Sequence, residues 1–294
     1  MSTPQHKIGP FSASLVVSVA DYEPGVDGYS IDLNGPTNDS KAIAEVLAAP
    51  VRRRRGRILR LLRRLFRPRR RIRGKAPHSR IKDEGADKTS VSKAFADLCE
   101  AIQPGQTGLF YFSGHGTQIA DATGTEADGL TECLCPYDTL SGNLLTDDEI
   151  RATISERLHP SAKLLMLIDC CHSGGQARSI ERQRGVDLEG IVGFSKDFNF
   201  DDRLHPGVVL LTASKPDEVA WERVYEGRPM GAFTYHLLPH LRAIVDGSET
   251  DLTAVHSDLI GKLYDPNVPN GSGSQTPCIE SRGSVEQLVS FLIP

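Results

Sequence analysis

Cys171 and His115 are the two side chains of this 294-residue chain whose types and positions best fit nucleophilic chemistry. Each follows a short apolar run: residues 163–168 precede the cysteine and residues 108–112 precede the histidine. A thiol with an ordinary pKa is only slightly ionised at neutral pH, so a nucleophilic cysteine needs an imidazole nearby. We predict that Cys171 is a nucleophile and that His115 is its base and later its general acid. Either residue alone is more commonly structural.

Two buried strands must carry these side chains to one place. Short apolar runs closed by small and polar residues, such as 108–113 and 163–169, are typical of parallel strands buried on both faces. The carboxyl ends of parallel strands meet at one edge of the sheet, where open α/β folds place their chemistry. The sequence therefore predicts that Cys171 and His115 meet at that edge.

The residues around the nucleophile can be sorted by strand geometry. Neighbouring side chains on an extended strand point to opposite faces, so Cys170 is expected to turn into the core when Cys171 enters the site. The same alternation excludes His172 as the base. It places Asp169 on the side of Cys171.

Two motifs resemble the paired signatures of metacaspases, which are cysteine peptidases of the caspase-like clan. They are Ser113-Gly-His115-Gly and Asp169-Cys-Cys171-His-Ser-Gly. Their histidine and cysteine are 56 residues apart, close to the roughly 50 residues of the caspase signature. A third segment, Gly35-Pro-Thr-Asn38-Asp39, is similar to the helix start that follows the first strand in metacaspases.

The resemblance implies a caspase-like α/β fold, with a mainly parallel sheet of roughly six strands covered by helices on both faces. It makes residues 1–175 a catalytic region like the large caspase subunit, with a basic insertion at 51–77. Residues 207–294 then correspond to the small subunit, and both belong to one domain. Between them, residues 176–206 form a linker that is rich in Arg and offers sites for autoprocessing of a zymogen.

The resemblance also implies a role for each site residue. Cys171 and His115 form the catalytic dyad, and the N–H groups of Gly116 and Cys171 form the oxyanion hole. The S1 substrate site consists of Asp39, Ser113 and Asp169. The two carboxylates, with Ser113 beside them, imply cleavage of protein substrates after Arg or Lys, in contrast to the preference of caspases for Asp. Asp39 has an alternative interpretation as a helix-capping acid.

Calcium is where the chain departs from many metacaspases, which bind activating Ca²⁺ through several acids. Asp147 and Asp148 match two of those positions, but Thr131 and Arg178 stand at two others. Ca²⁺ usually takes six or more oxygen ligands, so we expect a weak and incomplete site and no required cofactor. The acids that could substitute are Glu132 and Asp128.

A basic segment interrupts an otherwise acidic chain. Residues 51–75 hold thirteen Arg and one Lys, so the net charge of −4 leaves −18 for the remainder. Ile58, Leu61, Leu62 and Leu65 share one helical face with Arg on the other, and such a basic amphipathic helix can bind an anionic membrane or nucleic acid. We favour a solvated insertion, because the segment is short and isolated. A third interpretation is a string of cleavable Arg bonds or a tethered ligand for the enzyme's own acidic cleft. An alternative function is therefore an inactive caspase-like scaffold that attaches through this segment.

Composition and sequence pattern also give expectations for the location of the protein, the redox state of its cysteines and its oligomeric state. No run approaches the 18 apolar residues of a membrane span, and residues 1–7 lack the apolar part of a signal peptide, so we expect a cytoplasmic protein. Six cysteines without zinc-type spacing suggest reduced thiols. The resemblance indicates a monomer. Residues 118–145 are expected to form an acidic loop, and Thr146 to cap a helix.

Overall fold

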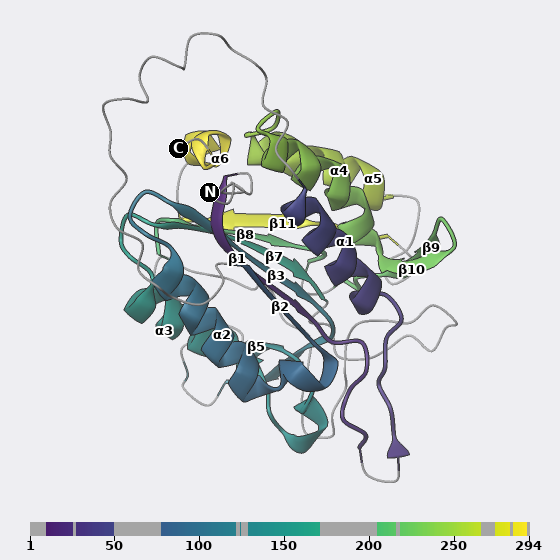
Figure 1. Ribbon diagram of the computed structural model, residues 1–294. Helices are drawn as coiled ribbons and strands as arrows, with labels where there is room; N and C mark the ends of the chain where they lie inside the picture. Colours follow the sequence, from purple (N-terminus) through teal and green to yellow (C-terminus); the bar gives the residue numbers. More distant parts are fainter. Residues whose placement is uncertain are drawn as a thin grey trace, which may run out of the picture.

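A six-stranded sheet with the order β11-β8-β7-β3-β1-β2 forms the centre of the molecule (Figure 1). Five strands run parallel, and β11 is antiparallel to β8 at one edge, which confirms the predicted fold class. The strands are β1 (Phe11–Ser18), β2 (His78–Lys82), β3 (Thr107–Ser113), β7 (Lys163–Asp169), β8 (Val208–Thr212) and β11 (Cys278–Ser281). The computed structural model describes residues 10–25, 28–49, 78–121, 124, 129–170, 205–215, 218–265, 274–282 and 285–292.

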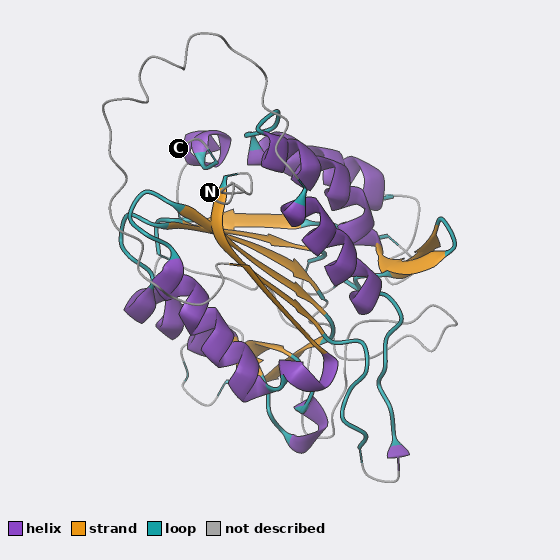
Figure 2. Ribbon diagram, viewed as in Figure 1, coloured by secondary structure: helices purple, strands orange, loops and turns teal. Residues whose placement is uncertain are grey.

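Helices cover both faces of this sheet (Figure 2). One layer consists of α2 (Lys88–Ala101) and α3 (Asp147–Arg157). The other consists of α1 (Pro36–Ala48), α4 (Ala232–Asp246), α5 (Leu252–Leu263) and the short α6 (Val285–Ser290). No helix within the described ranges is long and apolar enough to span a membrane.

Strand β3 shows why the sequence produces two cores. All seven of its residues are buried. Phe110 and Phe112 pack in the core beneath α2 and α3, whereas Leu109 and Tyr111 pack in the core beneath α1 and α4. Because side chains alternate along a strand, one apolar run fills both layers and fixes the register of the strand.

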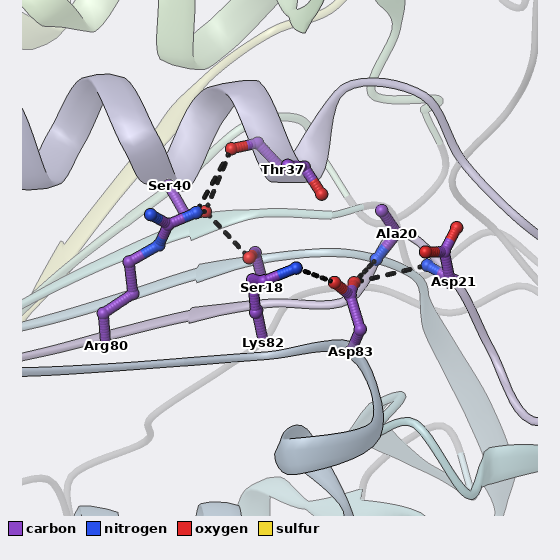
Figure 3. A network of polar contacts seen from close by, with 8 residues as sticks. All are labelled: Ser18, Ala20, Asp21, Thr37, Ser40, Arg80, Lys82 and Asp83. Atoms are coloured by element: carbon purple, nitrogen blue, oxygen red, sulfur yellow. Dashed lines mark hydrogen bonds and ion pairs between the residues drawn. The ribbon is translucent and has the colours of Figure 1, made fainter.

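The edge strand β2 is attached to α1 by polar side chains (Figure 3). The Arg80 guanidinium donates to Ser40 Oγ at 3.0 Å, and Ser40 Oγ lies 2.8 Å from Ser18 Oγ. Where β2 ends, Asp83 Oδ1 accepts the Ala20 N–H at 3.0 Å. These bonds fix the point at which the chain rejoins the sheet after the basic segment.

The expectation of a loop over residues 118–145 was wrong. This region contributes to a three-stranded antiparallel sheet of β4 (Gly116–Ala120), β5 (Leu130–Leu134) and β6 (Leu145–Thr146). Its strands are short and carry buried polar residues, so they lack the apolar alternation that indicates a strand. Gln118 Nε2 donates to Glu132 Oε1 at 3.2 Å, and this bond compensates the burial of both groups.

Helix ends follow local capping rules. The predicted cap of α3 is present, since Thr146 and Glu149 form a complete capping box. Helix α2 is capped by Asp87, whose side chain accepts the Ser90 N–H. Between β8 and α4 a hairpin that the sequence did not reveal, β9 (Glu222–Tyr225) and β10 (Arg228–Gly231), extends beside α1 (Figure 1).

Several predictions fall outside the described residues. They concern the insertion at 51–77, the linker at 176–206 except for His205 and Pro206, and the nucleophile Cys171. The division into large-subunit-like and small-subunit-like regions stays a prediction.

Candidate active site

The carboxyl ends of β3 and β7 lie side by side. Ser113 and Asp169 are register partners at the ends of these two strands, and Ser18 of β1 is the partner of Ser113 on the other side. His115 follows β3 by two residues, and Cys171 follows β7 by two residues. Both predicted dyad residues thus follow paired strand ends, and that their side chains meet stays a prediction, because Cys171 lies outside the described residues.

His115 is held by main-chain and side-chain contacts from the loop between β1 and α1. Its ring Nε2 lies 2.7 Å from the Ile31 carbonyl oxygen. The main-chain N–H of His115 donates to the Tyr22 hydroxyl at 2.7 Å. A carbonyl oxygen can only accept, so Nε2 must carry a proton. In the neutral ring Nδ1 is then the basic nitrogen, and it is the atom that can take a proton from a thiol.

Gly114 permits this arrangement. A Cβ at this position would lie 2.9 Å from the Tyr22 hydroxyl, which is closer than real Cβ atoms approach, and 3.1 Å from the Phe112 ring, which is tighter than most Cβ contacts. The Tyr22 ring lies 5.1 Å from the His115 ring, between centroids. Sequence reasoning found Gly114 in the motif but missed Tyr22 and Ile31, because nothing in their local pattern links them to a histidine about 90 residues away.

The predicted nucleophile Cys171 lies outside the described residues, but its neighbour Cys170 is described. Cys170 is buried in the core on the α2 and α3 side of the sheet, as the alternation predicted. Burial raises the pKa of the Cys99 thiol to about 12 and that of Cys278 to about 11, and it also raises the pKa of Cys133. These three thiols therefore stay protonated at neutral pH and do not compete as nucleophiles.

The predicted S1 residues converge on the N-terminus of α4. Asp39 Oδ2 accepts the Ser113 hydroxyl at 2.9 Å, and Oδ1 accepts the Gly231 N–H at 3.0 Å. Asp169 Oδ2 accepts the Thr234 hydroxyl at 2.5 Å and the Thr234 N–H at 3.2 Å. Both carboxylates are 0% exposed, and they face the positive end of a helix dipole.

The alternative interpretation of Asp39 as a capping acid is wrong. Helix α1 begins at Pro36 after Gly35, and no side chain of its own caps it. Asp39 lies within the first turn and directs its carboxylate to β3 and α4. Its bonds thus join three elements at the carboxyl edge of the sheet.

Gly116, which is predicted to contribute to the oxyanion hole, is the first residue of β4. It pairs with Leu134 of β5, and the adjacent Cys135 N–H donates to the His115 carbonyl at 3.0 Å. Hydrogen-bonded and non-hydrogen-bonded pairs alternate along an antiparallel ladder. The oxyanion hole itself stays a prediction, because Cys171 lies outside the described residues.

Of the predicted calcium residues, Asp147 and Asp148 are both bonded to an arginine. Arg151, one turn along α3, contacts both acids: Nη1 lies 3.0 Å from Asp147 Oδ2, and Nη2 bonds to Asp148 Oδ1. Across the described part of the chain, no group of three or more His, Cys, Asp or Glu residues is placed to hold a metal ion. Thr131 and Glu132 are buried in β5, whereas Arg178 and Asp128 lie outside the described residues. The donor set does not fit Ca²⁺, because a guanidinium already neutralises the two acids.

Comparison with protein families and curated proteins gives a consistent assignment. The family model of the caspase domain matches residues 12–289. Metacaspase-2 of Arabidopsis thaliana is 40% identical over 87 residues, which are 30% of this chain and 21% of that protein. Metacaspase-1A of Aspergillus niger is 25% identical over 217 residues, which are 60% of this chain and 54% of that protein. The chain thus spans about a fifth to a half of the length of these relatives.

Solved structures share the fold at low sequence identity. Protein GSU0716 from Geobacter sulfurreducens superposes with a TM-score of 0.61 at 19% identity, covering 92% of this chain and 93% of that one. Caspase-1 from Spodoptera frugiperda superposes with a TM-score of 0.52 at 14% identity, covering 96% and 91%. These similarities support the caspase-like architecture.

Proposed function

We propose, from the premise that the chain belongs to the caspase-domain family and is metacaspase-like within it, that the protein is a cysteine endopeptidase cleaving after Arg or Lys. One observation carries the proposal. The carboxylates of Asp39 and Asp169 and the hydroxyl of Ser113 converge at the sheet edge that also positions His115.

The chemistry follows from the tautomer of His115. Nδ1 accepts the proton of the Cys171 thiol, and the thiolate attacks the scissile carbonyl carbon. The Gly116 and Cys171 N–H groups stabilise the oxyanion. When the C–N bond breaks, the imidazolium returns its proton to the leaving nitrogen and a thioester remains. Water, deprotonated by His115, then attacks the thioester and releases the carboxylate product and the thiol.

The proposed specificity rests on charge. Asp39 and Asp169 are both buried, and their carboxylates accept hydrogen bonds from Ser113, Thr234 and the Gly231 N–H. A carboxylate away from water favours a cationic partner, and a guanidinium can bind carboxylates through paired hydrogen bonds. An acidic side chain at the cleaved bond would face like charges. We therefore propose protein or peptide substrates with Arg or Lys at that position.

We also propose that activity does not require calcium. The support is the ion pairing of Arg151 with Asp147 and Asp148, which supplies a positive charge from within the chain. Autoprocessing after Arg in the segment 176–206, and contact of residues 51–75 with an anionic surface, are further proposals that rest on sequence.

One experiment tests the proposed activity. Wild type, Cys171→Ala and Cys278→Ala are incubated with an Arg-aminomethylcoumarin peptide and with a matched Asp peptide. We expect release of the fluorophore from the Arg peptide by the wild type and by Cys278→Ala, whose thiol has a raised pKa. Equal turnover by Cys171→Ala, or faster cleavage of the Asp peptide, would refute the proposal. Mass spectrometry of the incubated proteins maps any autoprocessing.

A further inference from the structure

Glu222, at the start of β9, bonds across the molecule to the beginning of α1. Its carboxylate accepts the Gly35 N–H at 2.7 Å through Oε1 and the Asn34 N–H at 3.2 Å through Oε2. The residue is 7% exposed. A buried carboxylate is costly unless it is hydrogen-bonded, so these bonds define where Glu222 can lie.

These bonds supply what α1 lacks. Its N-cap is Gly35, which offers no side-chain acceptor, and Pro36 follows at the first helical position. The first N–H groups of a helix need acceptors, and a negative charge is favourable at that end. Glu222, 187 residues away in sequence, is thus the capping acceptor of α1.

The same turn of α1 is bonded to the opposite strand of the hairpin. Asn38 Nδ2 donates to the Pro229 carbonyl at 2.8 Å, and Asp39 accepts the Gly231 N–H. Gly231 is the register partner of Glu222 in the β9 and β10 ladder.

The contacts therefore close a ring. Glu222 accepts from Gly35, and the Gly35 carbonyl accepts the Asp39 N–H at 2.9 Å. Asp39 in turn accepts from Gly231, which pairs with Glu222. We propose that Glu222 is a positioning residue for substrate recognition: it holds the first turn of α1 against the hairpin and so sets the place of Asp39. This inference rests on the proposed function, in which Asp39 binds the substrate cation.

Glu222→Gln tests the ring with little change of shape. One amide oxygen can keep a single acceptor, while the amide NH₂ faces the other main-chain N–H, so the first turn of α1 is released. We expect KM for the Arg peptide to rise about tenfold with kcat within about twofold, because only binding of the cation is weakened. Inhibition by benzamidine, a small cationic probe, should weaken by a similar factor. Glu222→Asp retains the charge and is expected to recover part of the affinity.

Two measurements separate positioning from a general structural role. The rate at which iodoacetamide alkylates Cys171 reports on the dyad, and the melting temperature reports on the fold. We expect the alkylation rate in Glu222→Gln to match that of the wild type. The matched control is Glu226→Gln, an exposed residue of the same hairpin, which should leave all values unchanged.

Two results would overturn the inference. One is an unchanged KM and benzamidine affinity in Glu222→Gln. The other is a loss of alkylation parallel to the loss of affinity, which would indicate a disturbed fold. If the wild type alkylates normally but cleaves no Arg or Lys peptide, the proposed function itself fails and this inference fails with it.

Discussion

The Nε2 atom of His115 lies 2.7 Å from the carbonyl oxygen of Ile31, and this contact fixes which ring nitrogen is basic. The acceptor is main-chain, so no substitution at Ile31 removes it directly. The position of His115 can instead be tested by mutation of Tyr22. The Tyr22 hydroxyl accepts the main-chain N–H of His115, and its ring lies against the imidazole. The loop from β1 to α1 thus positions the His115 ring, the predicted base.

Tyr22→Phe removes that hydroxyl and leaves the buried His115 N–H without this acceptor. An unsatisfied buried donor costs about 1–3 kcal/mol, so we expect the free energy of unfolding to fall by that amount. We also expect kcat to fall, because the imidazole is less well oriented. Urea unfolding and peptide hydrolysis check these effects. Tyr29→Phe, at a tyrosine that is 59% exposed, is the control and should change neither value.

The sequence predicted the central sheet well because its strands are unambiguous. Strands β3 and β7 are continuous apolar runs that end in small or charged residues, and this pattern fixes both the strand and its active end. Asp39, Ser113 and Asp169 were identified through motif resemblance, and their contacts agree with one shared site.

Contacts that depend on distant main-chain groups could not be predicted. Tyr22 and Ile31 meet His115, and Glu222 meets Gly35, across long stretches of sequence that only the folded sheet brings together. The strand β4 was missed for a local reason. Its Gln118 is polar and buried, and its partner Glu132 lies on β5, so neither strand shows a clear apolar period.

Asp39→Asn should selectively weaken recognition of a cationic substrate. Asparagine retains the size of the side chain but removes a buried negative charge, and losing one partner of a buried charge pair costs several kcal/mol. We expect kcat/KM for Arg and Lys peptides to fall about a hundredfold, which corresponds to roughly 2.7 kcal/mol. Hydrolysis of paired Arg and citrulline peptides measures the charge preference.

The control for this prediction is Asp21→Asn, at an exposed aspartate in the loop that follows β1. It changes the net charge equally and should leave kcat/KM unchanged. A discrimination between Arg and citrulline that survives in Asp39→Asn would contradict the proposed role of Asp39.

The stability of the protein should decline in mild acid. Burial lowers the pKa of His78, His205 and His236 below the ordinary value of 6.5, with nearby Lys262 and Arg223 adding to the effect at His236. Between the lowered and the ordinary pKa, the unfolded chain binds more protons than the folded one, so stability rises with pH in this window.

We therefore expect the free energy of unfolding to fall as pH decreases from about 7.5 to 5. Urea unfolding at several pH values measures the slope. His78→Asn should flatten it, since asparagine does not titrate and can still contact Ser14, which lies 2.9 Å from the His78 ring. A slope that is the same in wild type and variant would show that His78 makes no contribution.

Arg151→Ala should convert the acid pair at the start of α3 into a place where a cation binds. Arg151 pairs with Asp147, which is 2% exposed, and removing one partner of a buried pair costs about 3 kcal/mol. We expect the variant to be destabilised by that order and to recover part of its melting temperature in millimolar CaCl₂, because a ligand that binds only the folded state stabilises it. The wild type should show no such shift.

Arg157→Ala is the matched control on the same helix. Arg157 pairs with Glu100 at 2.5 Å, and both side chains are about half exposed, so its loss should cost less than about 1 kcal/mol. Calcium should not change its melting temperature. Thermal unfolding and peptide hydrolysis, each with CaCl₂ and with EGTA, measure both quantities. A wild type that is activated many-fold by calcium would contradict the view that Arg151 takes the place of the metal, since its guanidinium and Ca²⁺ would then have to compete for the same two carboxylates.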